Sequence, residues 1–209
     1  MNYLSYEDMA NIINMNISNL VESNYDLVVG IPRSGMIPAY MIALKLNINC
    51  CSIEEFLKNN VLKSGNTRAT KIELNFPHDA KNILVVDDSI FSGESLKKEL
   101  RRVPVHLKER ITTLAIISSR KKRDDVDIFF KYLSPPRVFE WNLFHHAIIT
   151  RSALDIDGVL CKDPTPGEND DGEKYIKFLK EAKPLFIPSQ EIALLVTSRL
   201  EKYREETEF

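Results

Sequence analysis

The chain has 209 residues, of which 44% are hydrophobic and 28% are charged, and its formal net charge is −2. This composition is typical of a globular protein, and the length is enough for one domain of ordinary size and part of a second. A net charge so close to zero gives no bulk electrostatic argument for nucleic-acid binding, and no apolar run approaches the roughly 20 residues of a membrane span.

The N-terminal residues and the cysteines favour a cytoplasmic protein. The first eight residues, MNYLSYED, lack the basic and apolar regions of a signal peptide. Cys50, Cys51 and Cys161 form no metal-binding spacing. The adjacent pair is more typical of free thiols on a strand than of a disulfide.

Periodicity predicts alternating helices and strands along the chain. A first helix is expected over residues 5–22, with Ser5 as its N-cap and an apolar face made by Ile12, Ile13, Ile17, Leu20 and Val21. Strands are expected near residues 26–31, 49–54, 83–87, 111–117 and 127–132, and further helices near 35–46 and 93–102. This alternation predicts an α/β fold with a doubly wound, mostly parallel sheet, whose ligands bind beyond the carboxyl ends of the strands.

The first loop at a strand end is the turn GIPRSG, from Gly30 to Gly35. It follows an apolar strand and precedes a helix. The guanidinium of Arg33 and the backbone N–H groups around Ser34 and Gly35 suit phosphate oxygens. A Gly-Pro turn before a helix is common, so this turn alone is a weak indication.

The second loop follows the apolar run ILVV, which ends at Asp87 and Asp88. A loop rich in Ser and Gly comes next, and then a helical stretch from Ser95. The N-terminus of a helix binds phosphate, and two adjacent carboxylates suit sugar hydroxyls or a magnesium ion. The order of these parts predicts a ligand that is both a phosphate and a polyol, whereas the alternative is a plain strand-to-helix turn with Asp as an N-cap.

The run DDSIFSGES resembles the signature of type I phosphoribosyltransferases that binds 5-phosphoribosyl 1-pyrophosphate (PRPP). The resemblance implies that Asp87 and Asp88 hold the ribose 2′ and 3′ hydroxyls together with Mg²⁺, and that the segment from Ser92 to Ser95 encloses the 5-phosphate. The turn at Arg33 resembles the pyrophosphate loop of the same family. Arg33, Asp87 and Asp88 are then the implied catalytic residues. The implied substrate-binding residues of the two loops are Arg33, Ser34, Gly35, Asp87, Asp88, Ser89, Ile90, Phe91, Ser92, Gly93, Glu94 and Ser95.

A polar, basic segment separates the two loops, from Phe56 to Lys81. In the family this region is a mobile loop that closes over PRPP and excludes water. The resemblance implies that Lys63, Arg68 and Lys71 lie near the pyrophosphate. A solvated basic loop is the alternative for each of them.

One residue of the signature departs from the family pattern. In the purine-salvage branch the position of Phe91 carries an acidic residue that acts as a base toward the purine. Phe91 takes no proton, which argues against a hypoxanthine- or guanine-type enzyme. The chemistry at C1 stays intact, because it depends mainly on stabilising the ribose cation and the leaving pyrophosphate.

The segment PPRVFEWNLFHH, residues 135–146, holds the single tryptophan of the chain. In the family the corresponding region is a variable hood that binds the acceptor. Trp141 or Phe139 is a candidate to stack on an acceptor, and Glu140 or His145 is a candidate base. The alternative is an aromatic hinge between two domains. The first domain is predicted over residues 1–146, with 135–146 as hood or hinge.

The remainder, residues 147–209, resembles the N-terminal half of a haloacid-dehalogenase-like (HAD-like) phosphatase, a partial Rossmann-like α/β segment. The run DIDG after a strand resembles the first motif of that family, which implies Asp155 as nucleophile and Asp157 as general acid/base, both on Mg²⁺. Thr197, at the end of a later apolar run, matches the second motif and is implied to bind the phosphoryl group. The family's later lysine and acidic pair are not in this chain, so we expect either a fragment of a longer protein or a structural half-domain, without phosphatase activity.

The two resemblances together predict a phosphoribosyltransferase that uses PRPP and Mg²⁺ and releases pyrophosphate. An adjoining phosphatase would remove the 5-phosphate from the product, which favours a sugar or glycan hydroxyl as acceptor. Nucleobase salvage, with orotate or a purine, is the alternative enzyme, and a PRPP-sensing module without turnover is the alternative class. Homodimers are usual in the family, although no residue pattern identifies an interface.

Overall fold

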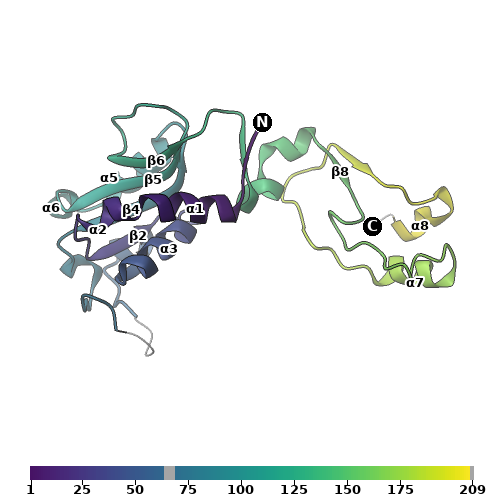
Figure 1. Ribbon diagram of the computed structural model, residues 1–209, viewed down its shortest axis with the longest axis horizontal. Helices are drawn as coiled ribbons and strands as arrows, with labels where there is room; N and C mark the ends of the chain where they lie inside the picture. Colours follow the sequence, from purple (N-terminus) through teal and green to yellow (C-terminus); the bar gives the residue numbers. More distant parts are fainter. Residues whose placement is uncertain (64–68, 208–209) are drawn as a thin grey trace. The chain divides into compact units, whose positions relative to one another are not determined.

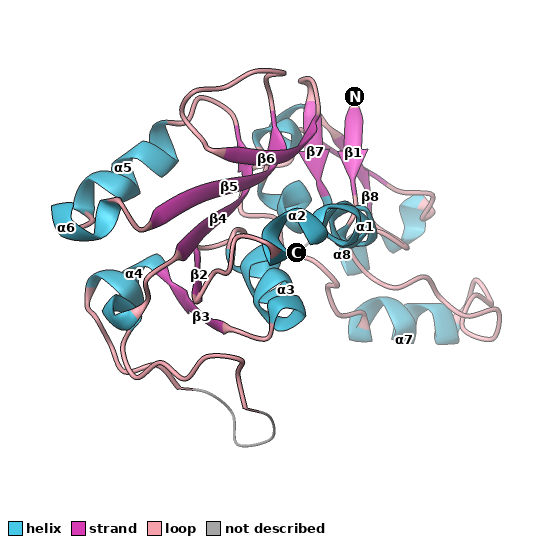
Figure 2. Cartoon of the chain, turned by 60° about the vertical axis from the view of Figure 1, so that its left-hand side comes forward, coloured by secondary structure: helices cyan, strands magenta, loops and turns pink. Residues whose placement is uncertain are grey.

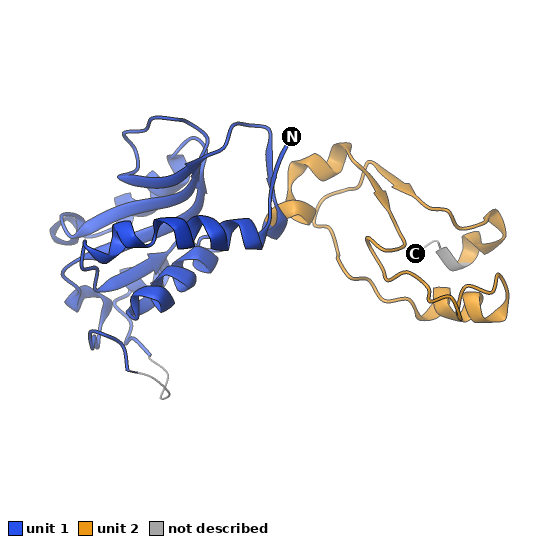
Figure 3. Ribbon diagram, in the orientation of Figure 1, with its two compact units in different colours: residues 1–141 blue, residues 142–209 orange. Residues whose placement is uncertain are grey.

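The computed structural model describes residues 1–63 and 69–207 of the chain. The chain divides into two compact units, Met1–Trp141 and Asn142–Phe209, which are coloured separately in Figure 3. Among the described residues, no helix has the length and apolar character needed to cross a membrane.

The first unit is built on a five-stranded parallel sheet (Figure 2). Its strands lie in the order β3-β2-β4-β5-β6, and every neighbouring pair is parallel. The bounds are β2 (Leu27–Gly30), β3 (Asn49–Ser52), β4 (Ile83–Ile90), β5 (Ile111–Ser118) and β6 (Ile128–Tyr132). The predicted α/β fold with a mostly parallel sheet is therefore confirmed.

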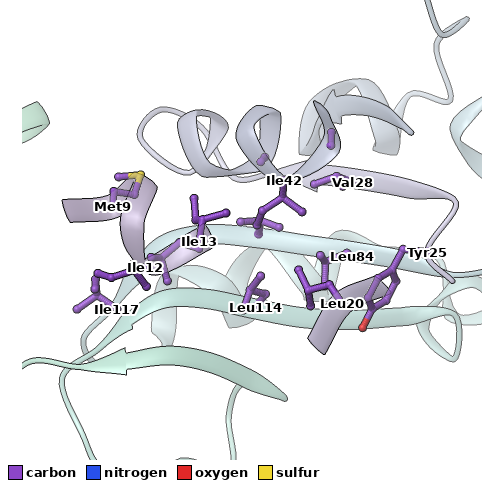
Figure 4. Close-up of a cluster of buried hydrophobic side chains, with 14 of the residues drawn as sticks. Met9, Ile12, Ile13, Leu20, Tyr25, Val28, Ile42, Leu84, Leu114 and Ile117 are labelled. Atoms are coloured by element: carbon purple, nitrogen blue, oxygen red, sulfur yellow. The ribbon is translucent and has the colours of Figure 1, made fainter. Parts of the chain in front are cut away.

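Helices cover both faces of this sheet because the buried strands are apolar on both sides. In β4, Leu84 and Val86 join the core that contains α1 (Tyr6–Asn16) and α3 (Met36–Leu46), part of which is shown in Figure 4. Ile83 and Val85 face the opposite core. That second core contains residues of α4 (Ile53–Leu57), α5 (Glu94–Arg102) and α6 (Val105–Lys108). The strands thus have two buried faces, as expected for a doubly wound sheet.

Two helical regions differ from the expectation, and a capping residue explains one of them. Ser5 caps α1 through a capping box with Asp8, as predicted, but α1 ends at Asn16 and a separate short helix, α2 (Ser18–Val21), follows. The strand expected over 49–54 ends at Ser52. There the Ser52 hydroxyl accepts from the N–H of Glu55 and begins α4, which the sequence patterns did not predict.

The strand that carries the two aspartates is longer than expected. β4 continues through Asp87 and Asp88 to Ile90, because its last residues still pair with β5, which extends to Ser118. On its other side, β2 ends at Gly30, opposite Val86. Both aspartates therefore lie beyond the end of β2, at the carboxyl edge of the sheet.

Two short strands that the sequence did not indicate fix the end of the first unit. β1 (Asn2–Leu4) pairs in parallel with β7 (Arg137–Phe139). The pairing brings the N-terminal residues beside the segment before Trp141, 132 or more positions away in the sequence. The N-terminus therefore contributes to the position of the predicted acceptor segment.

The second unit contains a small parallel sheet of its own, drawn in the green-to-yellow part of the colour scale in Figure 1. β8 (Ala153–Asp155) pairs with β9 (Leu194–Val196). Its separate core joins Tyr175 and Leu179 of α7 (Glu173–Glu181) to Tyr203, next to α8 (Arg204–Thr207). Short 3-10 turns make up the rest of its regular structure: η2 (Glu140–His145), which begins at the last residues of the first unit, η3 (Ala147–Arg151) and η4 (Glu201–Tyr203).

Candidate active site

The two predicted phosphate loops meet through the carboxylate of Asp88. The Ser34 hydroxyl, in the turn between β2 and α3, donates to Asp88 Oδ1 at 2.9 Å. The indole N–H of Trp141 donates to Asp88 Oδ2 at 2.7 Å. Asp88 is buried, at 5% exposure, so each of its two oxygens has a protein donor in place of water. Asp88 thereby connects Ser34 and Trp141, which lie 54 and 53 positions away from it in the sequence.

Asp87 lies beside Asp88 and is partly buried. Its Oδ1 accepts from the backbone N–H of Asp88 at 2.9 Å. Burial, together with the negative charge of Asp88, raises the pKa of Asp87 well above its usual range. Two crowded carboxylates of this kind fit a hard divalent cation, which relieves their repulsion. The donor set of Asp87 and Asp88 therefore suits Mg²⁺, although no group of three or more such ligands exists in residues 1–63 and 69–207.

Gly35 lets the pyrophosphate turn approach the aspartates closely. A Cβ at this position would lie 2.5 Å from the carbonyl oxygen of Ile31 and 3.0 Å from Asp87 Oδ1. Only a residue without a side chain fits between the turn and β4. The N–H of Ile31 also donates to the Val86 carbonyl at 2.9 Å, so the beginning of the turn is held against β4.

The carbonyl groups of the second loop are held by residues that sequence reasoning missed. The Ile90 carbonyl accepts from the Ser119 N–H and from Arg137 Nη2, each at 3.1 Å. The Phe91 carbonyl accepts from the Ser119 hydroxyl and from Arg123 Nη1, each at 3.0 Å. These donors come from the segment after β5 and from β7, and nothing in their local sequence indicates the contact.

Arg123 is itself fixed by a buried ion pair. Its Nε and Nη2 donate to the two oxygens of Asp125, both at 2.7 Å, and the two side chains are 0% and 9% exposed. Gly93 adopts a left-handed conformation, with φ of 86°, and a Cβ there would overlap the Asp125 carboxylate. The loop shape thus depends on Gly93 and on this bidentate pair together.

Gly93 also begins α5, and the predicted 5-phosphate cradle lies at that helix N-terminus. Ser92, Glu94 and Ser95 are exposed there, and the Glu94 N–H faces the Ser92 hydroxyl at 3.4 Å. The free N–H groups of a first turn are suitable phosphate donors. The Glu94 carboxylate instead lies 3.9 Å from Lys97 Nζ. The groups at this helix N-terminus that match the predicted phosphate site are therefore the backbone N–H groups and the serines.

The basic segment between the loops is placed only in part. Lys63 is exposed, and Arg68 lies outside the described residues. The backbone N–H of Lys71 donates to the Asn47 carbonyl at 2.6 Å, next to the start of β3. That is the amino edge of the sheet, opposite the two loops, so the expectation that Lys71 lies near the pyrophosphate is wrong for this structure.

The predicted acceptor residues are engaged in different ways. Trp141 stacks on Phe139, with ring centroids 4.9 Å apart and planes 2° apart, and also contacts the Tyr6 ring. Glu140 accepts from the N–H of Tyr6 at 2.8 Å, at the start of α1. The indole of Trp141 is therefore a donor to Asp88 packed among protein rings, and Glu140 serves as a helix cap in place of the expected base.

The predicted phosphatase residues lie at one edge of the second sheet. Asp155 ends β8 in register with Val196 of β9, and Thr197 follows directly. Asp157 accepts from Arg199 Nε at 2.9 Å and from Arg199 Nη2 as well. Burial opposes the charge of Asp157, but the Arg199 guanidinium holds its pKa below the usual value. His145 contacts Ser189, with Nδ1 and Oγ 3.0 Å apart, within this unit.

The family of the chain follows from a profile comparison. The profile described as "Phosphoribosyl transferase domain" matches residues 2–148, more than half of the chain. The chain therefore belongs to the phosphoribosyltransferase family. This match covers both loops and the acceptor segment. No curated protein sequence matches the chain.

Several solved structures are similar to the first unit. A purine phosphoribosyltransferase from Pyrococcus horikoshii is 18% identical with a TM-score of 0.45, covering 66% of this chain and 92% of its own. A xanthine-guanine-hypoxanthine phosphoribosyltransferase from Helicobacter pylori is 19% identical with a TM-score of 0.48, covering 67% and 92%. An orotate phosphoribosyltransferase from Aeropyrum pernix is 18% identical with a TM-score of 0.39, covering 61% and 71%.

Proposed function

We propose that the first unit transfers a 5-phosphoribosyl group from PRPP to an acceptor and releases pyrophosphate. The observation that carries the proposal is the Asp88 carboxylate at the junction of the two loops, bonded to Ser34 of the pyrophosphate turn. The family membership of residues 2–148 agrees with this chemistry. The two loops lie at the carboxyl edge of a parallel sheet, where ligands of such folds bind.

Each group of site residues would bind the part of PRPP that its charge suits. Arg33 and the N–H groups of the turn would bind the pyrophosphate, whose negative charge increases as the bond to C1 breaks. Asp87 and Asp88 would hold the ribose hydroxyls and stabilise the developing positive charge of the ribose. Mg²⁺, which Asp87 and Asp88 would hold, supplies neutralising charge for the pyrophosphate when it is bound. The α5 N-terminus, with Ser92 and Ser95, would fix the 5-phosphate.

Release of pyrophosphate tests this function. The 209-residue protein is incubated with PRPP, Mg²⁺ and a panel of nucleobases and glycans, and binding of PRPP is measured by calorimetry. We expect Asp88→Asn to weaken PRPP binding at least tenfold, because it removes the charge that its hydroxyl and indole neighbours orient. Asp124→Asn is the matched control, since Asp124 is an exposed acid in the segment after β5. Unchanged PRPP binding by the Asp88 variant would contradict the proposal.

The panel also separates the candidate acceptors. Turnover with orotate or a purine indicates nucleobase salvage, whereas turnover with a glycan alone indicates ribosyl transfer to a hydroxyl. Binding of PRPP without pyrophosphate release for any acceptor indicates a sensing module. Phe91, a residue without a titratable group at the end of β4, favours an acceptor other than hypoxanthine or guanine.

We also propose that the second unit is HAD-like. The parallel pairing of β8 with β9 places Asp155 beside the segment of Thr197, as the two early motifs of that family require. In a longer chain such a unit would remove the 5-phosphate after transfer, with Asp155 as nucleophile, Asp157 as acid/base and Mg²⁺ between them. For the 209-residue chain we expect no phosphate release from phosphoribosyl products in a malachite-green assay. Magnesium-dependent release that is lost in Asp155→Asn would contradict this expectation.

A further inference from the structure

Arg137 is a cation beside the second loop, in contact with aromatic rings and a backbone carbonyl. Arg137 begins β7, and its Nη2 donates to the Ile90 carbonyl at 3.1 Å. Its guanidinium carbon lies 5.9 Å from the ring centre of Phe91 and 5.3 Å from that of Phe139. The cation therefore contacts two aromatic rings near the end of the strand that carries Asp87 and Asp88.

Arg137 has no carboxylate partner within the described part of the chain. Its Nη1 is shielded from water and makes no hydrogen bond there. The neighbouring Arg123, equally close to the loop, has both oxygens of Asp125. Asp88 bears on Arg137 through its charge, but the hydrogen bonds of its carboxylate come from Ser34 and Trp141.

An unpaired buried cation is costly, and proteins rarely keep one without use. Burial lowers the pKa of Arg137, against the opposing effect of the Asp88 charge, while the charge of Arg123 lowers it further. A ligand anion beside Nη1 would supply the counter-charge that the described residues do not place against this guanidinium. The N–H of Nη1 is the donor that remains for such an anion.

Phe91 explains why the protein itself does not supply that anion. An acidic side chain at this position would lie beside the guanidinium and neutralise it. A phenyl ring lies against the cation instead, and Phe91 is 64% exposed. The exposed Phe91 side chain has room to move beside the guanidinium, whereas the Phe91 carbonyl is held by Ser119 and Arg123.

We propose that Arg137 is a specificity-determining residue of the acceptor site, which selects an acceptor carrying an anionic oxygen, most simply a carboxylate. The inference rests on the proposed function, since it names the class of acceptor for the same site. The anion would pair with Nη1 of Arg137, and the rest of the acceptor would pack on the Phe91 ring. An acidic heterocycle and an acidic sugar share this chemistry.

Two pairs of probes test the proposal on the full chain with saturating PRPP and Mg²⁺. Orotate is compared with uracil, and methyl glucuronide with methyl glucoside, so that each pair differs by a carboxylate. Binding is measured by calorimetry for probes that give no turnover, and for the others it is taken from the KM of pyrophosphate release. We expect the acid of at least one pair to bind roughly tenfold or more tightly than its neutral partner, because charge-assisted hydrogen bonds are strong. The pair that shows the preference distinguishes a heterocycle from a sugar.

Variants then assign the preference to Arg137. Arg137→Gln should abolish it and Arg137→Lys should restore part of it. PRPP is kept saturating for each variant, because both replace the Nη2 donor to the Ile90 carbonyl. Arg120→Gln, which removes an exposed charge just after β5, is the matched control and should keep the preference. The proposal is overturned if the wild type binds the acid and neutral probes equally, or if it binds none of the four probes. A preference for the acid that survives in Arg137→Gln overturns it as well. Failure of PRPP itself to bind would instead refute the proposed transferase.

Discussion

Asp88 shows how a single side chain connects segments that are distant in the sequence. Its motif is evident in the chain, but its partners Ser34 and Trp141 are 54 and 53 positions away. A buried carboxylate needs hydrogen-bond donors in place of water. These two contacts supply the donors and fix the orientation of the Asp88 carboxylate. The tryptophan that the sequence offers as an acceptor platform is, in the structure, a hydrogen-bond donor to Asp88 of the proposed PRPP site.

Trp141→Phe is expected to weaken PRPP binding about three- to tenfold. Phenylalanine keeps a ring for Phe139 to stack on, but it lacks the N–H that donates to Asp88. Calorimetry measures the change, and the fluorescence of Trp141, the single tryptophan, reports PRPP binding to the wild type. Tyr6→Phe, which keeps the neighbouring ring, should bind PRPP normally. Wild-type affinity in Trp141→Phe would show that the indole N–H does not position Asp88.

The thiols of β3 are expected to react slowly in the folded protein. Burial raises the pKa of Cys50 to about 12 and that of Cys51 still further, whereas the pKa of an unfolded thiol is about 8.5. At pH 8, alkylation of native protein should be far slower than alkylation in urea, and its rate should rise about tenfold per pH unit. Reaction of native Cys50 at the unfolded rate would contradict the burial of β3.

The same shifts set the direction of a pH effect on stability. Between about pH 8.5 and 12 the unfolded chain loses thiol protons that the folded chain keeps. The folded state then binds more protons, so the free energy of unfolding should fall as the pH rises above about 8.5. Urea unfolding at pH 7, 9 and 10 measures this, and Cys50→Ala should reduce the slope.

Among the secondary-structure elements, the loop from β4 to α5 depends on the segment after β5. Ser119 and Arg123 hold the carbonyl groups of Ile90 and Phe91, and Asp125 holds Arg123. The sequence indicates the strand, the loop and the helix, because apolar runs, glycine and caps act locally. It does not indicate that Arg123 holds the Phe91 carbonyl, since that contact crosses 32 positions and arginine is common on surfaces.

Gly93→Ala is expected to destabilise the first unit by about 2 kcal/mol and to weaken PRPP binding. Alanine is disfavoured at a φ of 86°, and its methyl group would displace the Asp125 carboxylate from Arg123. Thermal unfolding and calorimetry measure the two effects. Gly167→Ala is the matched control, because a Cβ there has no heavy atom within 4 Å. Wild-type stability of Gly93→Ala would contradict this account of the loop.

The two units of the chain have separate cores. The buried clusters of the sheet belong to residues before Trp141, and Tyr175, Leu179 and Tyr203 form the core of the second unit. Within the second unit, the Asp157–Arg199 pair is also largely buried, with side chains 13% and 3% exposed. Damage to one core should therefore leave the ligand site on the other unit intact.

Asp157→Asn is expected to destabilise the second unit by about 1–3 kcal/mol, because Arg199 would lose its buried counter-charge. PRPP binding by the first unit should not change. Asp155→Asn is the matched control, since Asp155 is exposed and its Oδ1 accepts from the N–H of the adjacent Ile156. Thermal unfolding combined with calorimetry tests both statements, and a parallel loss of PRPP affinity in Asp157→Asn would show that the units are coupled.

The sequence alone was sufficient for the parallel α/β fold, the Ser5 cap and the two loops with their aspartates. These features arise from periodicity, capping and turn chemistry, which act over a few residues. The tertiary structure decided that Trp141 binds Asp88, that Lys71 lies at the far edge of the sheet, and that Arg137 keeps an unpaired N–H beside Phe91. Such contacts depend on which distant segments the sheet order brings together, and on which charges remain unpaired after they meet. Short-range patterns in one sequence indicate neither the segments that meet nor the charges that stay unpaired.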